Sequence, residues 1–240
     1  MKLQRYRHDS PVSYTLGATL TYEMLKEKPE LVKRLFIRPS TDRESGIGEI
    51  LALAAEKGIR IEESEKAFNI LSPKGNCYLI GEFEKREERL KPGNHIVLVN
   101  PSDAGNMGTI VRTAAGFGFG DIAVIRQAVD FFDPRTIRAT MGAAFHMRVE
   151  YFDTIEDYIK KFGSNERYAF MLTGSTPLPA AEKREPYSLI FGNEATGLPD
   201  RFADFCKAVR INHSGAIDSL NLPMAAGIAM YEFTKNIWNQ

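Results

Sequence analysis

Hydrophobic residues in the second half of the chain alternate between short continuous runs and stretches with helical spacing. Residues 95–100 (HIVLVN) form a continuous apolar run, and residues 121–125 (DIAVI) form another. Such runs are typical of strands that are buried on both faces of a parallel sheet. Further strands are expected at RVEYF, YAFMLT, YSLIFG and AVRIN, and helices at TIVRTAAGFG, TIRATMGAAF, TIEDYIKKFG and PMAAGIAMYEFTKNIW. The pattern predicts an α/β fold, a doubly wound parallel sheet with helices on both faces.

The first ninety residues predict a smaller α/β unit. Apolar positions recur with helical spacing in TLTYEMLKEKPELV and GIGEILALAAEKG, where Gly58 is suited to end the helix. The segments VKRLFI, IRIEE and NCYLIGEF are expected to be strands. No apolar face can be drawn through residues 84–93 (EKREERLKPG), a charged stretch that ends in Pro-Gly. The expected domains are therefore 1–90 and 91–240.

Composition narrows the class of protein. The chain has 240 residues, of which 43% are hydrophobic and 26% charged, as in ordinary folded proteins. No apolar run is long enough for a membrane-spanning helix, and the N-terminus lacks the apolar core of a secretory signal, so we expect a cytoplasmic protein. Cys77 and Cys206 lie far apart and are expected to be buried or half-buried free thiols. The four histidines have no metal-ligand spacing, which argues against a metal site.

The net charge of zero neither favours nor excludes a nucleic-acid partner. Residues 1–38 contain eight Lys and Arg against four Asp and Glu. Phosphate-backbone binding requires local basic patches of this kind. A solvated surface explains the same excess equally well, so charge alone leaves both interpretations open.

The most glycine-rich stretch is residues 103–121 (DAGNMGTIVRTAAGFGFGD). Gly118 and Gly120 precede a strand, whereas a dinucleotide fingerprint places its glycines between a strand and the following helix, so we expect them to end a helix. This placement argues against a nicotinamide dehydrogenase. GNMG does lie between a strand and a helix, where helix amides can meet an anion. Arg112, one turn into that helix, either reaches back towards a phosphate or is an ordinary exposed arginine.

Two later stretches also carry candidate chemistry. In residues 189–199 (LIFGNEATGLP), Glu194 stands between Gly192 and Gly197 after a buried strand, and a helix N-terminal acid is the simpler alternative. In residues 211–232 (INHSGAIDSLNLPMAAGIAMYE), Ser219 and Asn221 precede Pro223, so they are candidates either for a site or for capping the closing helix.

Three motifs occur in order: N-x-G-x-x-x-R-T-A-x-x-F-G (residues 106–118), F-G-N-E-x-x-G-L (191–198) and I-x-x-x-G-x-x-x-S-L-N (211–221). Together they resemble the signature motifs of the SpoU (TrmH-like) RNA ribose 2′-O-methyltransferases of the SPOUT superfamily. RATMGAAF (138–145) looks like the ASxGA stretch of this family, with Thr140 in place of Ser. The resemblance covers about residues 95–240. More loosely, residues 13–90 are similar to the L30e-like substrate-binding domain that many members carry.

This resemblance implies a C-terminal trefoil knot, which the general rarity of knots would not have suggested. It also implies an enzyme that transfers a methyl group from S-adenosyl-L-methionine to a ribose 2′-hydroxyl of rRNA or tRNA, and a homodimer with active sites completed near the interface. The presence of the extra domain favours rRNA over tRNA as the partner. No metal or membrane partner is expected. Carried over residue by residue, the cofactor loops begin at Thr173, Gly192, Ile211 and Leu220, and the catalytic candidates are Asn106, Arg112, Glu194, Ser219 and Asn221.

The resemblance implies roles for these residues. Arg112 either fixes the substrate phosphate and stabilises the forming alkoxide, or serves as base in a strongly perturbed site, since a guanidinium is otherwise protonated. Asn106 and Asn221 would orient loops and ribose, Glu194 would position Arg112 or the motif loops, and Ser219 would hydrogen-bond the cofactor pocket.

The chain departs from the family pattern at two places. Asn212-His213 replaces Pro-Met after Ile211, and Leu222-Pro223 replaces Val-Ser or Val-Ala after the SLN triplet. These changes put the pocket shape in doubt. The alternative function is a non-catalytic RNA-binding protein that retains the fold. The small-residue stretch MAAGIA is compatible with close approach to a partner or with intramolecular packing.

Overall fold

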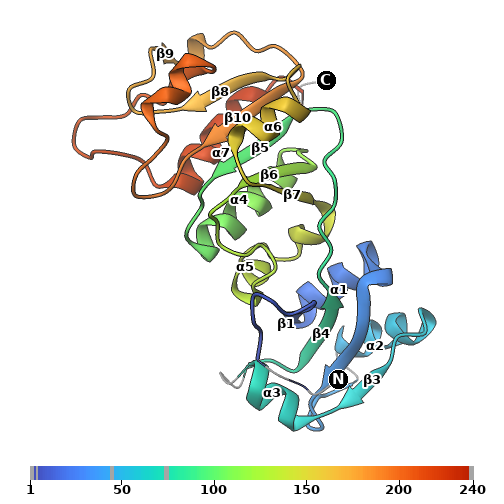
Figure 1. Cartoon of the computed structure of the whole chain (residues 1–240). Helices are drawn as coiled ribbons and strands as arrows, with labels where there is room; N and C mark the ends of the chain where they lie inside the picture. The colour runs from blue at the N-terminus through green and yellow to red at the C-terminus, as the bar shows by residue number, and fades with distance from the viewer. Residues whose placement is uncertain (1–2, 4, 44–45, 73–75, 238–240) are drawn as a thin grey trace. The chain divides into compact units, whose positions relative to one another are not determined.

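The computed structural model describes residues 3, 5–43, 46–72 and 76–237, and the chain divides into two compact units (Figure 1). The first unit comprises Met1–Arg86 and Asp130–His146, and the second comprises Glu87–Val129 and Met147–Gln240. The division between Arg86 and Glu87 falls inside the charged stretch. Nothing in the sequence pattern indicated that Asp130–His146 belongs to the first unit. The functional assignment of domains 1–90 and 91–240 stays a prediction.

The first unit is built on a four-stranded sheet with the order β1-β4-β2-β3. Its helices are α1, α2, α3 and, from the returning segment, α5, with short 3-10 turns η1 (Pro29–Leu31) and η2 (Ala143–His146). The element bounds are β1 (Val12–Leu16), α1 (Ala18–Glu27), β2 (Val32–Ile37), α2 (Gly46–Glu56), β3 (Ile61–Glu63), α3 (Glu65–Leu71), β4 (Leu79–Glu84) and α5 (Pro134–Ala139). The predicted helices and strands of this part are present, whereas β1 and α3 were not predicted. The L30e-like character of the unit stays a prediction.

Polar and aromatic contacts hold the returning segment within the first unit. The Lys85 ammonium lies 2.9 Å from the Asp130 carboxylate, and the Phe83 and Phe145 rings meet edge to face at 5.4 Å. The Ser13 hydroxyl donates a hydrogen bond to the Phe132 carbonyl. These contacts join residues that lie between 45 and 119 positions apart in the sequence, a relation that local periodicity cannot reveal.

The helix predicted over residues 136–145 is wrong in its second half. α5 ends at Ala139, and Met141 and Gly142 follow with φ values of 52° and 97°. A β-carbon at Gly142 would come within 2.6 Å of the Glu23 side chain. The chain therefore passes so close to α1 that glycine is required, and the left-handed backbone breaks the helix before η2.

The second unit is built on a seven-stranded sheet with the order β7-β6-β5-β10-β8-β11-β9, in which every neighbouring pair is parallel. The strands match the predicted apolar runs except for β9, a two-residue strand at the edge. Their bounds are β5 (His95–Val99), β6 (Asp121–Ile125), β7 (Arg148–Phe152), β8 (Glu166–Phe170), β9 (Thr176–Pro177), β10 (Tyr187–Phe191) and β11 (Lys207–Arg210).

Helices cover both faces of this sheet, as predicted (Figure 1). α6 (Ile155–Lys161) and the 3-10 turn η4 (Asp200–Asp204) pack on one face, where Tyr158 and Phe202 join a core with Val97 and Ile190. α7 (Leu222–Thr234) contacts β10 on the other face and packs against α4 (Ala104–Gly116). The prediction of an α/β fold with a parallel sheet is confirmed, and the trefoil knot stays a prediction.

The small residues of α7 serve packing inside the unit. Ala226 and Ala229 are buried, and a β-carbon at Gly227 would lie 3.6 Å from the Thr113 side chain of α4. The predicted closing helix extends to Trp238, which lies outside the described residues. None of the helices in the described part of the chain is both long and apolar enough to cross a membrane.

Candidate cofactor cavity at the strand ends

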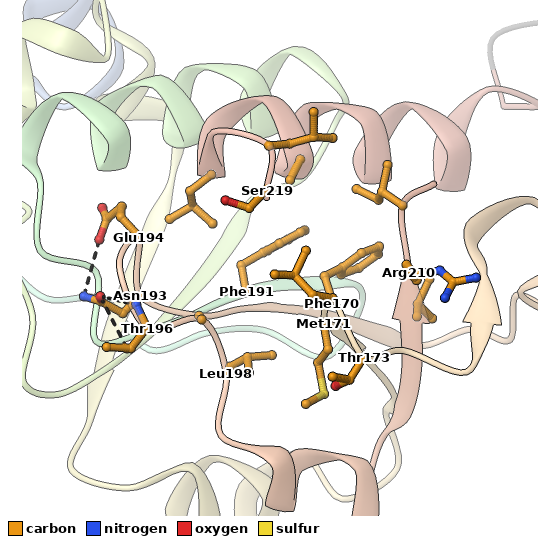
Figure 2. A pocket seen from close by; sticks show the side chains of 18 of the residues that line it. Phe170, Met171, Thr173, Phe191, Asn193, Glu194, Thr196, Leu198, Arg210 and Ser219 are labelled. Atoms are coloured by element: carbon orange, nitrogen blue, oxygen red, sulfur yellow. Dashed lines mark hydrogen bonds between the residues drawn. The ribbon is translucent and has the colours of Figure 1, made fainter. Parts of the chain in front are cut away.

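A cavity of about 330 Å³ lies at the carboxyl ends of the neighbouring strands β10, β8 and β11. Its walls are the loops that follow these strands, together with the segment that leads into α7. Phe170 and Phe191, the last residues of β8 and β10, stack with centroids 4.7 Å apart and form an apolar surface inside it (Figure 2). Parallel α/β sheets bind ligands at this edge, and the volume suits a small-molecule cofactor.

Two glycines bring the backbone of these loops close together. A β-carbon at Gly192 would lie 2.2 Å from the Gly197 carbonyl carbon and 2.5 Å from the Leu198 nitrogen. A β-carbon at Gly174 would lie 2.5 Å from the carbonyl carbon of Val209. Neither place admits a side chain, so main-chain groups line these parts of the cavity wall.

The Glu194 carboxylate holds the start of α4. One oxygen, Oε2, accepts hydrogen bonds from the Ser102 amide at 3.0 Å and the Ser102 hydroxyl at 2.7 Å. The other, Oε1, accepts from the Asp103 amide at 3.2 Å and from Asn106 Nδ2 at 3.3 Å. GNMG does not lie between the strand and the helix as predicted, because α4 already begins at Ala104. Glu194 instead holds the segment before this helix, and it reaches the helix itself through Asn106 Nδ2.

This environment favours the ionised form of Glu194. Partial burial acts to raise the pKa of the Glu194 carboxyl, but the hydrogen bonds from Ser102 and Asn106 outweigh burial and hold the pKa below its ordinary value. Asp103 caps α4 from within, since its side chain accepts from the Asn106 amide at 2.7 Å. Two carboxylates therefore stabilise the positive end of this helix.

All four predicted cofactor residues, Thr173, Gly192, Ile211 and Leu220, line the cavity. Of the catalytic candidates, Glu194 and Ser219 also line it (Figure 2). Asn106 does not line it but is hydrogen-bonded to Glu194. Arg112 and Asn221 do not line the cavity.

Arg112 and Asn221 occupy exposed positions on two neighbouring helices. Arg112 is exposed on α4, opposite the buried Ile110 and Ala114, as predicted, and within the described part of the chain its guanidinium has no hydrogen-bond or ion-pair partner. Asn221 is the N-cap residue of α7 by position, but its side chain makes no capping bond there. The capping explanation for Asn221 is therefore not supported, and both side chains are available to a ligand.

Asn193 is a functional candidate that the sequence analysis passed over. Its Oδ1 accepts from the amides of Ala195 and Thr196 at 2.9 and 3.2 Å, while its Nδ2 donates to the Asn100 carbonyl at 2.8 Å. Asn193 thereby shapes the loop after β10 and ties it to the end of β5. Its place beside Glu194 in the FGNE motif was the signal that could have identified it.

His213 also lines the cavity, at the position where the chain departs from the family pattern. Its Nε2 is buried and has no hydrogen-bond partner within the described residues. A buried unpaired nitrogen is unfavourable, and a polar ligand can relieve it. The apolar surface, the narrow main-chain walls and this nitrogen together fit S-adenosylmethionine, which presents a flat adenine ring and several polar groups.

The chain belongs to the SpoU rRNA methylase family, whose model matches residues 93–231. The resemblance drawn from the three motifs is therefore confirmed. The matched region is a SpoU-type methyltransferase fold, and it contains every wall of the cavity described above.

Individual relatives resemble the chain over most of its length. The chain is 27% identical to the 23S rRNA (guanosine(2553)-2′-O)-methyltransferase RlmP of Bacillus subtilis, over 90% of this chain and 85% of that protein. A crystal structure of an AdoMet-bound rRNA methyltransferase from Sinorhizobium meliloti is 28% identical, with a TM-score of 0.82, over 95% of this chain and 88% of the other. A structure described as giving insights into 2-OH methylation of C/U34 on tRNA is 28% identical, with a TM-score of 0.58, over 62% of this chain and 99% of the other.

Cys77 is buried and Cys206 half-buried, and both are free thiols, as predicted. Within the described residues, Glu23, Glu27 and His146 form a cluster of possible metal ligands in the first unit, with the two imidazole nitrogens 3.0 and 3.6 Å from the two carboxylates. That no metal takes part stays a prediction.

Proposed function

We propose that this protein transfers a methyl group from S-adenosylmethionine to a ribose 2′-hydroxyl of ribosomal RNA. The observation that carries the proposal is the cavity at the strand ends, lined by all four family cofactor positions and joined through Glu194 to the start of α4. When bound, S-adenosylmethionine supplies an electrophilic methyl group. The protein must then hold the ribose in line with that group and accommodate the loss of the hydroxyl proton.

The residues of the cavity divide this work. Main-chain groups beside Gly192, Thr173, Ile211 and Leu220 bind the cofactor, and the Phe170 and Phe191 rings exclude water from it. Ser219, at the cavity wall, is available to bind cofactor or ribose because no described contact uses its hydroxyl. Glu194 fixes Asn106 and the loop before α4, which holds the first motif (residues 106–118) against the second (191–198).

Arg112 binds substrate rather than cofactor in this proposal. Its guanidinium is exposed on α4 and carries a planar set of donors that matches a phosphate. A charged guanidinium beside the reacting ribose also stabilises negative charge as the hydroxyl proton leaves. We therefore favour phosphate binding and alkoxide stabilisation over a role as base, with Asn221 orienting the ribose.

The pattern of similarity supports rRNA over tRNA. The rRNA relative from Bacillus subtilis matches 90% of this chain, which includes most of the first unit. The structure concerned with tRNA position 34 is covered almost completely but matches only 62% of this chain. A counterpart of the first unit is thus present in the rRNA relative, and we assign RNA binding to this unit. The two free thiols agree with the cytoplasm as the proposed compartment.

We also propose a homodimer that pairs through α7. Met224, Ile228 and Tyr231 follow helical spacing and are 61%, 39% and 57% exposed, respectively. An exposed apolar stripe of this kind marks a protein interface, and identical helices can cover each other in a symmetric dimer. Because Arg112 does not line the cavity of its own chain, the partner's Arg112 completes the site in this arrangement.

Methyl transfer to RNA that lacks the modification tests the function. Labelled S-adenosylmethionine is incubated with rRNA or tRNA from a strain that lacks the gene, and the methylated nucleotide is mapped. We expect 2′-O-methylation of rRNA, its loss in Arg112→Ala, and normal transfer in Arg184→Ala, an exposed arginine paired with Glu182. If calorimetry shows that the protein binds RNA but no S-adenosylmethionine, the non-catalytic alternative is correct.

A further inference from the structure

The first unit carries an exposed tyrosine that is stacked on an arginine. Tyr78 immediately precedes β4 and is 47% exposed. The guanidinium carbon of Arg38 lies 6.0 Å from the centroid of the Tyr78 ring and 5.0 Å from that of the Phe68 ring. The guanidinium is thus over both rings, one buried and one open to solvent.

Arg38 is held mainly by these rings and by the backbone around it. Its Nε is buried without a hydrogen-bond partner in the described part of the chain, and its one ion pair is with Glu65 at 3.6 Å. The Arg38 amide and the Thr41 hydroxyl both donate to the Tyr78 carbonyl at 3.3 Å. Tyr78 therefore has a fixed backbone and a charged group against one side of its ring, while nearly half of the residue remains open.

The first unit also carries an exposed guanidinium. The side chain of Arg138, on α5, is exposed and makes no hydrogen bond or ion pair among the described residues. Burial raises the pKa of the Cys77 thiol, and the charges of Arg38 and Arg138 act in the opposite direction. The positive charges of both arginines therefore act on the residue next to Tyr78, and the ring contact places Arg38 directly beside it.

We propose that Tyr78, Arg38 and Arg138 form a binding site for an unpaired nucleotide of the RNA substrate. The open side of the Tyr78 ring stacks a base, and the two guanidiniums attract the adjoining phosphates. Proteins that bind single-stranded RNA combine these same elements, an exposed aromatic ring and positive charge along the backbone. The inference rests on the proposed function, because it takes RNA as the substrate, and it adds where an unpaired nucleotide of that RNA is held.

Exposed tyrosines are common, so the stacked arginine is what distinguishes Tyr78. Tyr22, on α1 of the same unit, is 42% exposed, and no cation lies over its ring among the described contacts. Tyr22 therefore provides a matched control: the same side chain, similar exposure and the same unit, without the flanking arginines.

Fluorescence anisotropy of the full-length protein tests the site. The probes are a labelled ten-nucleotide oligouridylate and an RNA duplex of the same length. We expect Tyr78→Ala to weaken binding of the single strand about tenfold, Tyr78→Phe to retain it, and Tyr22→Ala to leave it unchanged. Binding of the duplex, which offers no free base, should not respond to Tyr78→Ala.

Arg138→Gln should weaken binding of the single strand and lower the slope of log affinity against log salt by about one. Equal affinities of Tyr78→Ala, Tyr22→Ala and wild type would overturn the proposed site, and so would a tenfold loss that extends to the duplex. Calorimetric binding of S-adenosylmethionine, expected to be normal in all these variants, separates the two proposals: loss of base stacking with cofactor binding intact concerns this site alone. A wild-type protein that binds neither RNA nor cofactor refutes the proposed function itself.

Discussion

Glu194 is the residue through which the loop after β10 holds the start of α4. Its carboxylate accepts hydrogen bonds from three groups of Ser102 and Asp103 and from Nδ2 of the Asn106 side chain. Amides at the start of a helix commonly bind phosphate. Here the Ser102 and Asp103 amides just before α4 donate to Glu194, and the Asn106 backbone amide inside it donates to Asp103. Side chains of the protein thus hold this end of the helix, and the first two motifs act as one structural element.

The stabilising effect of Glu194 should depend on pH. Its pKa is lowered in the folded protein, so its contribution is complete above the ordinary value of 4.5 and is lost as pH falls through the folded value. We expect Glu194→Gln to lower the free energy of unfolding by about 1 kcal/mol at pH 7, with the difference from wild type shrinking below pH 4.5.

Urea denaturation at pH 7 and at steps below pH 5 measures this difference. Glu182→Gln serves as control, because Glu182 forms only an exposed pair with Arg184 and should change stability very little. A Glu194→Gln difference that stays constant with pH would show that the carboxylate charge does not stabilise the start of α4.

His213 should contribute to cofactor affinity through its unpaired Nε2. His213→Leu introduces an apolar side chain of similar size and removes the nitrogen. We expect this variant to bind S-adenosylmethionine about fivefold more weakly. His213→Gln should keep most of the affinity, because its amide can pair in the same region. Calorimetric dissociation constants test this, with Asn212→Ala, an exposed neighbour that does not line the cavity, as control. Equal affinities for His213→Leu and wild type would show that the nitrogen stays unpaired in the complex.

At the scale of elements, the sequence predicted the strands better than the points at which helices end. β6 matches its predicted segment from end to end and β5 matches to within one residue, because strands that are buried on both faces of a parallel sheet are continuous apolar runs. β1 and β9 were missed, because β9 has only two residues and the polar Ser13 and Thr15 interrupt the apolar run of β1. α3 was missed because seven residues give too little periodicity, and the break at Met141 and Gly142 depends on the approach of α1, which no local pattern contains.

The loop after β10 should not tolerate a side chain at its first glycine. Gly192→Ala would place a β-carbon 2.2 Å from the Gly197 backbone, so the loop must open. We expect a loss of about 2 kcal/mol in the free energy of unfolding and weaker binding of S-adenosylmethionine.

Gly116→Ala provides the matched control, because the added β-carbon meets nothing within 4 Å at the end of α4. Alanine favours a helix over glycine, so this variant should be as stable as wild type or slightly more stable. Thermal melts and calorimetry measure both effects. If Gly192→Ala behaves like Gly116→Ala, the loop is not closed as described.

At the scale of the whole molecule, the motifs predicted the cavity better than the catalytic assembly. Thr173, Gly192, Ile211 and Leu220 all line the cavity because each follows a strand or precedes α7, so parallel topology gathers them at one edge. Arg112 and Asn221 are not gathered there, because both are exposed and neither lines the cavity, so the role of Arg112 depends on the proposed dimer. The return of Asp130–His146 to the first unit was likewise hidden, because it depends on contacts between distant residues.

The proposed dimer makes Ile228 the centre of an apolar interface on α7. Ile228→Glu places a charge on this stripe, and burying an unpaired charge is strongly unfavourable. We expect sedimentation to show a dimer for wild type, a monomer for Ile228→Glu and a dimer for the control Tyr22→Glu, which alters an exposed residue of the first unit. A monomeric wild type would refute the dimer.

Mixing two inactive variants then tests whether the partner's Arg112 completes each site. Arg112→Ala retains an intact cavity, whereas Gly192→Ala retains an intact arginine. In a mixed dimer the intact cavity of the first chain faces the intact arginine of the second, so one of its two sites is complete. Random pairing of equal amounts should restore about a quarter of the wild-type methyl transfer. If each arginine serves its own chain, no pairing restores a site and the mixture stays inactive. The same mixture made with Ile228→Glu in both chains should be inactive in either case, because its chains cannot pair.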